Sequence, residues 1–388
     1  MISSRNSVRL LMVTDKKFWK NDAGNTSFIF RRVEFLRNNY ELEIFYAGHP
    51  EPEDIQQVSA LGLADCVFYA SSWWKRLDSS HLEVDKTKLP PCLHPYSNPD
   101  LLNLFSLFLR EHHKFDAILF QYAYNAYLLD AIYYDVLTLV DTHDLFSRRP
   151  YRYRHMLEPM TMTFDEEGQL LDRFNCALLC ELSEWQAAKT MLKRAIPIYC
   201  SSIQQPVGVP FPPMGSQFGY IASGNPLNRE GLGWFLDNIW PLYKNAHAKL
   251  HIFGDVCDAI ANQQYIRQVF LHGRIEDARD AYRTCNIMIN PVLNGTGIKI
   301  KTLEALAYGR PIITTPEGAR GMDQLIGHGI WLARNRGDFL SGMYALANDC
   351  FLFNKYSTQG QALVHRDFSP EASMRQFSLL LTEYCNGG

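Results

Sequence analysis

Short apolar runs alternate with amphipathic stretches along the 388-residue chain. The first apolar run, at 8–15, predicts a buried strand, and a polar loop at 16–25 separates it from a helix predicted at 26–38. A second strand at 42–47 completes the opening of a Rossmann-like parallel sheet. The same alternation predicts further strands at 66–70, 117–122, 138–141, 176–180 and 196–201, and helices at 99–113, 125–134 and 183–194.

The second half of the chain begins the alternation again. Its predicted strands lie at 218–223, 249–253, 269–272, 287–292, 312–315 and 330–333, and its helices at about 232–243, 276–284, 298–308 and from 337 onward. Residues 165–168 and 224–231 are expected to be loops. A stretch at 204–215 holds four prolines and predicts a linker. We therefore expect two α/β/α domains facing each other across a ligand-binding cleft, an N-terminal one at 1–209 and a C-terminal one from 210.

Composition narrows the classes of function. The net charge of −3 gives no sign of wholesale nucleic-acid binding, and 47% apolar residues are ordinary for a globular protein. Nine scattered cysteines without a CxxC pair predict free thiols in a reducing cytoplasm. No apolar run reaches the roughly 18 residues that span a bilayer, and no signal peptide is expected. Aromatic and basic residues at 71–76 and 149–154 leave open a peripheral contact with the inner membrane surface.

A glycine loop followed by a helix carries the clearest chemistry. Gly295 and Gly297 stand just before the predicted helix, and Lys299 and Lys301 fall in its first turn. The helix dipole disfavours cations there, whereas bare amides and lysines together suit an anion such as phosphate. Gly297, Lys301 and Glu304 share one helix face, so Lys301 is the better phosphate candidate and Glu304 can accept hydrogen bonds from vicinal hydroxyls. The alternative is a solvated helix with incidental lysines.

Two loops in the first half follow strands and are further candidates. The loop after the first strand contains Gly24 and Asn25, at the strand end where doubly wound sheets bind ligands. His143 follows the strand at 138–141. A histidine alone is more often structural, but this one lies between Asp141 and Asp144, which favours a functional role.

Residues 218–322 resemble, in order, the donor domain of the group 1 family of GT-B glycosyltransferases (family 4, retaining). The first half is similar more loosely, through Gly24, Asn25 and the segment 141–149. The segments that carry the resemblance in the second half are Gly224 to Gly231, Leu250 to Gly254, Gly273-Arg274, Asn290-Pro291, Gly295 to Pro311 and Gly318 to Gly321.

The resemblance implies roles for single residues. Glu304 would hold the nucleotide ribose, and the amides of Gly295, Thr296, Gly297 and Ile298 would meet the donor sugar and diphosphate. Lys301, helped by Lys299, would neutralise the phosphates. In the first half, His143 would contact the donor sugar near the reacting carbon, and Gly24 and Asn25 would close against the diphosphate and acceptor. Residues 367–388 are similar to the family's C-terminal helix that crosses back to the N-terminal domain, which limits the donor domain to 210–366.

Two positions depart from the family pattern. Asn294 replaces the first acid of the family's Glu-x7-Glu motif, and Glu230 stands where a phosphate-binding lysine is usual, with Arg229 or Arg274 as its substitute. These departures affect the contacts to the donor sugar more than those to the nucleotide.

The sequence therefore predicts a hexosyltransferase-like enzyme for polysaccharide biosynthesis. It would move a sugar from a nucleotide diphosphate sugar to a glycan or lipid-linked acceptor, with retention. No bound metal is predicted, because there is no Asp-x-Asp and no His/Cys cluster. No separate cofactor is expected beyond the donor substrate. The alternatives are a GT-B nucleotide-sugar epimerase and a non-catalytic nucleotide-sugar-binding protein.

Overall fold

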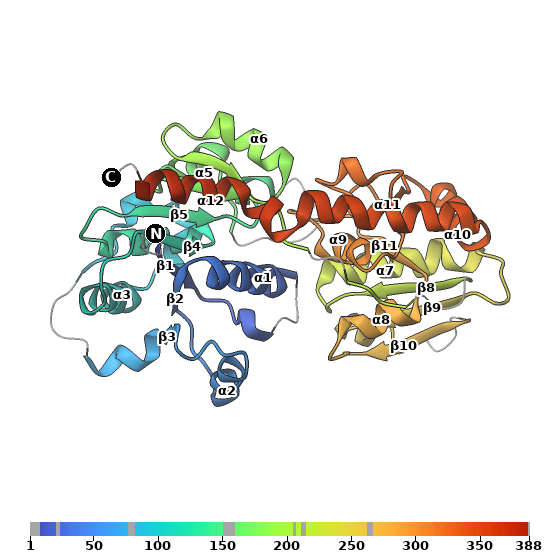
Figure 1. Cartoon of the computed structure of the whole chain (residues 1–388), viewed down its shortest axis with the longest axis horizontal. Coiled ribbons are helices and arrows are strands. Elements are labelled where there is room, and N and C mark those ends of the chain that lie inside the picture. Colours follow the sequence, from blue (N-terminus) through green and yellow to red (C-terminus); the bar gives the residue numbers. More distant parts are fainter. Residues whose placement is uncertain are drawn as a thin grey trace, which may run out of the picture. The chain divides into compact units, whose positions relative to one another are not determined.

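The computed structural model describes residues 8–20, 24–76, 82–149, 160–204, 207–210, 215–261 and 267–386. The chain divides into two compact units, each built around one parallel sheet (Figure 1). The first unit comprises Met1–Asn21, Asn25–Ser201 and Met374–Gly388, and the second comprises Asp22–Gly24 and Ser202–Ser373.

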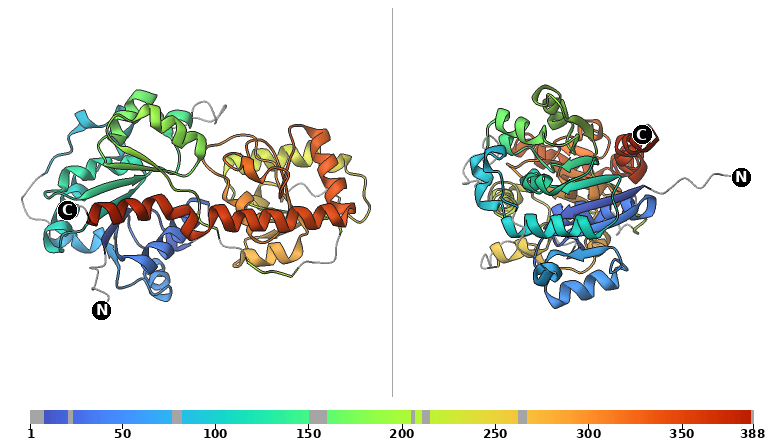
Figure 2. Two further views of the ribbon diagram at one scale, coloured as in Figure 1. Left: turned by 45° about the horizontal axis from the view of Figure 1, so that its top comes forward. Right: turned by 90° about the vertical axis from the view of Figure 1, so that its left-hand side faces the viewer.

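The sheet of the first unit has seven parallel strands in the order β3-β2-β1-β4-β5-β6-β7. These are β1 (Arg9–Thr14), β2 (Glu41–Tyr46), β3 (Val67–Tyr69), β4 (Ala117–Gln121), β5 (Leu137–Asp141), β6 (Cys176–Leu179) and β7 (Ile196–Tyr199). Helices cover both faces of this sheet (Figure 2), so its central strands are buried and read as continuous apolar runs. The helices are α1 (Gly24–Asn39), α2 (Pro52–Ala60), α3 (Pro99–Glu111), α5 (Phe164–Leu171), α6 (Leu182–Met191) and α12 (Pro370–Asn386).

The sheet of the second unit has six parallel strands in the order β10-β9-β8-β11-β12-β13. They are β8 (Gln217–Ile221), β9 (Lys249–Phe253), β10 (Val269–Gly273), β11 (Ile287–Asn290), β12 (Ile312–Thr314) and β13 (Ile330–Leu332). The helices are α7 (Pro226–Asn238), α8 (Ala278–Thr284), α9 (Ile300–Ala307), α10 (Arg336–Asn348) and α11 (Cys350–Phe368). The core packs strands β8, β9 and β11 against α7 and α10, through side chains such as Phe218, Ile252, Phe235 and Phe339.

Both sheets reverse their strand order at one point. In the first unit the reversal lies between β1 and β4, and in the second between β8 and β11. The segments that leave these strands diverge to opposite sides of the sheet, and ligands bind in the resulting crevice at the carboxyl ends. The candidate residues that follow β1, β5 and β11 therefore lie at the carboxyl ends of the strands, where doubly wound sheets bind ligands.

Several local predictions were wrong. Residues 165–168 lie in α5, because Thr163 and Glu166 form a reciprocal capping box that starts a helix. The predicted loop at 224–231 is mostly helix, since the Asn225 side chain caps α7 and Pro226 is its first residue. The predicted helix at 125–134 is a 3-10 helix over Ala123–Ala131.

Other predictions fall partly outside the described residues. These are the linker residues 205–206 and 211–214, the loop residues Asp22 and Ala23, and the basic aromatic stretch 150–154. Among the helices that the structure describes, none is both long and apolar enough to cross a membrane. All nine cysteines are free thiols, as the sequence predicts.

A buried arginine of α1 contacts β5, α12 and the residue that follows β7 in the first unit. Arg32 of α1 is 1% exposed, and its Nε lies 2.7 Å from a carboxylate oxygen of Asp141, which is completely buried at the end of β5. Arg32 also donates to the carbonyl oxygen of Cys200 at 2.8 Å, and its Nη1 lies 2.7 Å from the sulfur of Met374 in α12. The C-terminal helix is thus tied to the sheet two residues before His143.

Candidate active site

The glycine loop between β11 and α9 has a backbone that glycine makes possible. Gly295 has a φ of 134° and Gly297 a φ of 62°, both in the region where a Cβ is strained. Helix α9 begins at Ile300, with Lys299 as the residue before its first turn, rather than at 298 as predicted. The loop therefore brings its own amides and the start of α9 close together, which is the arrangement of an anion site.

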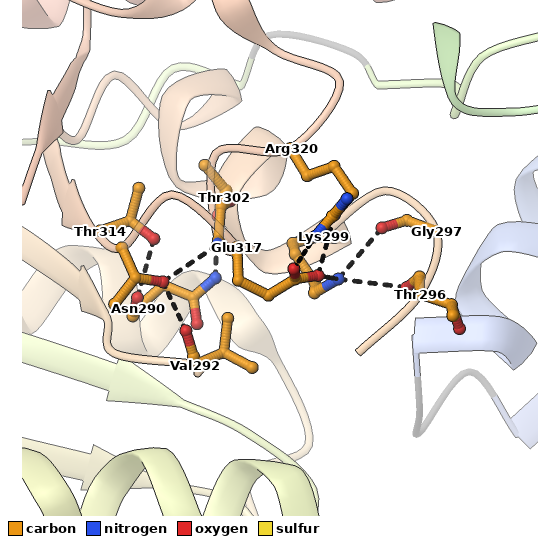
Figure 3. A network of polar contacts seen from close by, with 11 residues as sticks. Asn290, Val292, Thr296, Gly297, Lys299, Thr302, Thr314, Glu317 and Arg320 are labelled. Carbon is orange, nitrogen blue, oxygen red and sulfur yellow. Dashed lines mark hydrogen bonds and ion pairs between the residues drawn. The ribbon is translucent and has the colours of Figure 1, made fainter. Parts of the chain in front are cut away.

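The Lys299 side chain folds back on this loop and binds its carbonyl oxygens (Figure 3). Its ammonium donates to the carbonyl oxygens of Thr296 and Gly297, both at 3.1 Å, and forms an ion pair with Glu317 at 2.8 Å. Burial alone would raise the pKa of the Glu317 carboxyl, but hydrogen bonds from Arg320 and the charge of Lys299 outweigh it and lower the pKa. Lys299 thus fixes the loop, and much of its charge is offset by Glu317.

A second set of hydrogen bonds fixes the loop from behind (Figure 3). Asn290 donates to Thr302 at 3.0 Å, and Thr302 donates to the Gly318 carbonyl at 2.8 Å. Thr314 in turn donates to the Asn290 carbonyl at 2.7 Å. These bonds connect β11, α9 and the turn after β12. A loop held on both sides is preorganised, so its amides need little rearrangement when they meet an anion.

Lys301 points to the first turn of α7. Its ammonium donates to the side-chain oxygen of Asn228 at 2.6 Å and lies 3.4 Å from the Tyr220 hydroxyl. Burial, together with the charge of Lys299, lowers the pKa of Lys301 to about 7. Among the described residues no carboxylate raises this pKa, so the ammonium has only neutral partners. Lys301 is partly buried, and a desolvated cation without an anion beside it is costly, so a phosphate would supply the missing charge.

Binding of a diphosphate at Lys301 is expected to take up a proton above pH 7. In the free protein Lys301 loses its proton as the pH rises through about 7, whereas a bound diphosphate favours the charged form. Affinity should therefore fall above pH 7, by up to about tenfold per pH unit. Calorimetry at pH 8 in two buffers of different ionisation enthalpy measures the uptake. Lys301→Arg, which keeps its charge, should show none, and an equal signal in both proteins would contradict this role.

Glu304 lies one turn beyond Lys301 on α9. Its carboxylate accepts a hydrogen bond from the Tyr282 hydroxyl at 3.2 Å. Tyr282 is completely buried and stacks on Tyr308, with ring centroids 4.2 Å apart. Arg310 fixes the same tyrosine by donating to its backbone carbonyl at 2.7 Å. The orientation of Glu304 is therefore set by buried neighbours, while its partly exposed carboxylate can still accept hydrogen bonds from hydroxyl groups.

The remaining candidates of the second unit lie around the start of α7. The Asn294 amide donates to both carboxylate oxygens of Glu230, at 3.1 and 3.3 Å. Arg229 is exposed, and its guanidinium lies beside Gly224, where an added Cβ would be 3.3 Å from it. The structure thus brings the starts of α7 and α9 together with Asn294, the glycine loop and Lys301.

His143 lies in the first unit, at the carboxyl end of β5. Its φ of 62° is unusual for a residue with a side chain, and Tyr122, with a φ of 64°, shares this conformation. The two rings stack at 4.0 Å, and His143 Nε2 lies 2.7 Å from the Gln121 side-chain oxygen. With the amide oxygen facing the ring, Nε2 carries the hydrogen. Burial lowers the pKa of His143 to about 4, so the ring is neutral at pH 7.

His143 is expected to stay uncharged between pH 5.5 and 8. Its depressed pKa also means that the unfolded chain binds this proton first, so stability falls as the pH drops from about 6.5 towards 4. A histidine-selective NMR titration measures the charge state, and the His143→Gln variant identifies the signal. A midpoint near 6.5 for that signal would contradict the burial that the structure describes.

The loop that carries His143 is fixed by side chains that the sequence did not single out. Glu167 of α5 accepts hydrogen bonds from the backbone amides of Phe146 and Ser147, at 2.7 and 2.9 Å. Arg149 forms two parallel hydrogen bonds to Asp144, both at 2.9 Å. Glu167 lies 20 residues after Ser147, in helix α5 between β5 and β6, so the sequence carried no local signal of this contact.

Gly24 and Asn25 are the first residues of α1. The Asn25 side chain accepts a hydrogen bond from the Thr26 amide at 2.9 Å and also interacts with the Tyr122 hydroxyl. Asn25 and His143 thus contact the same tyrosine within the first unit. Tyr122 itself was missed by the sequence reading, although it directly follows β4 at the strand reversal.

Comparison with known proteins identifies the second unit. Residues 215–349 match the family model described as glycosyl transferases group 1. The second unit carries a group 1 glycosyltransferase domain. The resemblance inferred from the sequence is thereby confirmed for this part of the chain. The glycine loop, Lys301 and Glu304 all lie inside the matched glycosyltransferase domain.

Solved structures similar to the whole chain have the GT-B fold, as the sequence predicts. HepE of Anabaena in complex with UDP and glucose is 12% identical, covers 97% of this chain and 99% of its own, and has a TM-score of 0.69. Sucrose-phosphate synthase of Thermosynechococcus elongatus is 12% identical, covers 98% and 100%, and has a TM-score of 0.72. A point mutant of S. aureus TarM is 11% identical, covers 97% and 100%, and has a TM-score of 0.71.

One curated protein is similar over part of the sequence. It is an uncharacterized 44.6 kDa protein in the cps region of Klebsiella pneumoniae, 28% identical over 142 residues. This match spans 34% of the present chain and 33% of the relative, so it covers about a third of each protein.

Within the described residues, no group of three or more His, Cys, Asp or Glu side chains is placed to hold a metal ion.

Proposed function

We propose that this protein transfers a sugar from a nucleotide diphosphate sugar to a glycan or lipid-linked acceptor. The observation that carries the proposal is Lys301, a partly buried ammonium with neutral partners beside the glycine-loop amides and the start of α9. Glu304, one turn further, would accept hydrogen bonds from the ribose hydroxyls. An anion site followed at once by a hydroxyl-binding carboxylate fits the diphosphate and ribose of a nucleotide.

In the proposed reaction, negative charge would develop on the diphosphate beside Lys301 and the glycine loop. Transfer breaks the bond between the anomeric carbon and the diphosphate oxygen. The oxygen of the acceptor hydroxyl forms the new bond to that carbon, and its proton passes to the leaving diphosphate. Negative charge develops on the leaving diphosphate, which Lys301 and the amides of Gly295 to Ile298 would stabilise without any metal. Preorganised donors aimed at developing charge are usually the largest single catalytic contribution.

His143 has a supporting role in this proposal. Its neutral ring can hydrogen-bond a sugar hydroxyl near the reacting carbon without placing a positive charge beside the sugar. Gly24 and Asn25, at the start of α1, would meet the diphosphate and the acceptor. Transfer with retention of configuration and an acceptor-binding function for the first unit complete the proposal, both by analogy with the family.

The ligands bound in the similar structures, and the source of the curated relative, support this proposal. HepE was solved with UDP and glucose and also with UDP-glucose, and the TarM mutant with UDP, fondaparinux and α-GlcNAc-glycerol. The curated relative comes from a cps region. A nucleotide-sugar donor and a glycan acceptor agree with these ligands. A role in polysaccharide biosynthesis at the cytoplasmic side of a membrane is part of the proposal by analogy with the family.

The proposal is tested by incubating the protein with UDP-, GDP- and ADP-sugars, with and without glycan acceptors, and identifying the products by mass spectrometry and NMR. Transferred sugar, or free sugar with nucleoside diphosphate, supports a glycosyltransferase. An isomerised nucleotide sugar would show an epimerase instead. Tight binding with intact donor in every mixture would show a non-catalytic binding protein.

A further inference from the structure

Glu230 is a carboxylate beside the candidate phosphate site, where a negative charge does not help to bind phosphate. It is exposed on the second turn of α7, and both of its oxygens accept hydrogen bonds from the Asn294 amide, at 3.1 and 3.3 Å. Asn294 directly precedes the glycine loop. A carboxylate at the edge of an anion site repels the anion, so Glu230 weakens diphosphate binding unless it faces another part of the ligand.

The backbone fixes where this carboxylate lies. Gly231, the next residue, packs so closely on the segment after β11 that an added Cβ would lie 2.7 Å from the Pro291 carbonyl oxygen and 3.0 Å from Cα of Val292. Helix α7 therefore cannot shift along the loop. Glu230 is held beside Asn294 by this packing as well as by the amide.

The polar groups of the second unit follow an order that matches a nucleotide sugar. Along the chain from Asn294, the site offers first the Glu230 carboxylate, then the amides of 295–298 and Lys301, and last Glu304. A nucleotide sugar offers a hydroxyl-rich sugar, a doubly charged diphosphate and a hydroxyl-rich ribose. Carboxylates accept hydrogen bonds from hydroxyls, whereas amides and ammonium groups bind phosphates.

We infer that Glu230, held by Asn294, accepts hydrogen bonds from the hydroxyls of the donor sugar and so determines which sugars are used. This inference rests on the proposed function, since it assigns the sugar end of the same site. Neutral sugars with free vicinal hydroxyls fit the carboxylate. A uronic acid would bring a second carboxylate towards it and is disfavoured.

The test separates the sugar from the nucleotide. Affinities for UDP, GDP and ADP, and for UDP-glucose, GDP-mannose, ADP-glucose and UDP-glucuronic acid, are measured by calorimetry on the wild type, Glu230→Gln and Asn294→Ala. Donor turnover is measured in parallel. Circular dichroism melting of each variant checks that the exposed substitutions leave the fold intact.

Glu230→Gln is expected to change the affinity for the best nucleoside diphosphate by less than about twofold. It should lower kcat/KM for the matching neutral nucleotide sugar by roughly 10- to 100-fold, the range for a hydrogen bond to a charged group. Asn294→Ala keeps the Glu230 carboxylate but removes the amide that holds it. Its kcat/KM for the neutral nucleotide sugar should therefore lie between those of the wild type and Glu230→Gln. The preference for neutral over uronic sugars should also shrink in Glu230→Gln.

Two results would overturn the inference. Equal changes for the nucleoside diphosphate and its sugar derivative would show that Glu230 acts on the nucleotide or only on the loop. Unchanged values for both would show that it touches no ligand. A wild-type protein that binds none of the nucleotides would instead refute the proposed function, and the inference with it.

Discussion

Replacing Lys301 by alanine is expected to lower kcat/KM for sugar transfer by about two to three orders of magnitude, the usual cost of losing one preorganised donor to a developing charge. Lys299 cannot take over, because its ammonium is bound to the loop carbonyls and to Glu317. The measurement is steady-state transfer with the donor that the wild type accepts. Lys299→Met, as a comparison, should act mainly by loosening the loop.

Lys301 should also affect the free energy of unfolding and its dependence on pH. Its folded-state pKa of about 7 lies below the ordinary lysine value of 10.5, so the unfolded chain binds more protons between these values and stability rises with pH across this window. Lys301→Met removes a partly buried charge that has no carboxylate partner and should raise the free energy of unfolding at pH 7 by about 1–2 kcal/mol. A variant that is both inactive and less stable would contradict a phosphate site and indicate a structural lysine.

Replacing Arg32 by methionine is expected to lower the free energy of unfolding by about 3–5 kcal/mol, because it leaves the buried Asp141 carboxylate without its cation. The hydrogen bond to Cys200 is lost as well, and α12 loses its contact through Met374. Urea unfolding followed by circular dichroism measures the change.

The matched control is the double variant Arg32→Met/Asp141→Leu. Replacing both charges of a buried pair by apolar side chains is often neutral, so the double variant should recover a large part of the lost stability. A loss below about 1 kcal/mol in Arg32→Met would mean that water reaches this pair. Since Asp141 lies two residues before His143, the single variant should also lower transfer activity at temperatures where it remains folded.

The sequence predicted both parallel sheets because buried strands are the most regular pattern in the chain. Runs such as 117–122 and 249–253 coincide closely with β4 and β9. Errors arose where capping outweighed composition. Three acidic residues at 165–167 resemble a solvated loop, yet they occupy the first turn of α5, where acidic side chains favour a helix.

The site was predictable only as far as its chemistry is local. The order Gly295, Gly297, Lys301 and Glu304 is contained in ten residues, and the helix period places Lys301 and Glu304 on one face. The prediction that Gly297 shares this face was wrong, because Gly297 has a φ of 62° and lies in the loop before α9 begins at Ile300. Side-chain contacts between segments that are distant in the sequence could not be predicted from it. Lys301 meets Asn228 and Glu230 meets Asn294 only because the packing of α7 on the segment after β11 joins them. The left-handed backbone of Tyr122 and His143 has no signal in the sequence either.

The most direct test of the central claim is a crystal structure of the protein with the nucleoside diphosphate that stabilises it most in a thermal-shift screen. The proposed function predicts a phosphate oxygen within hydrogen-bonding distance of the Lys301 ammonium and of amides in 295–298, with the ribose hydroxyls on Glu304. A nucleotide bound elsewhere, with Lys301 still on Asn228 and no ribose hydroxyl on Glu304, would contradict it.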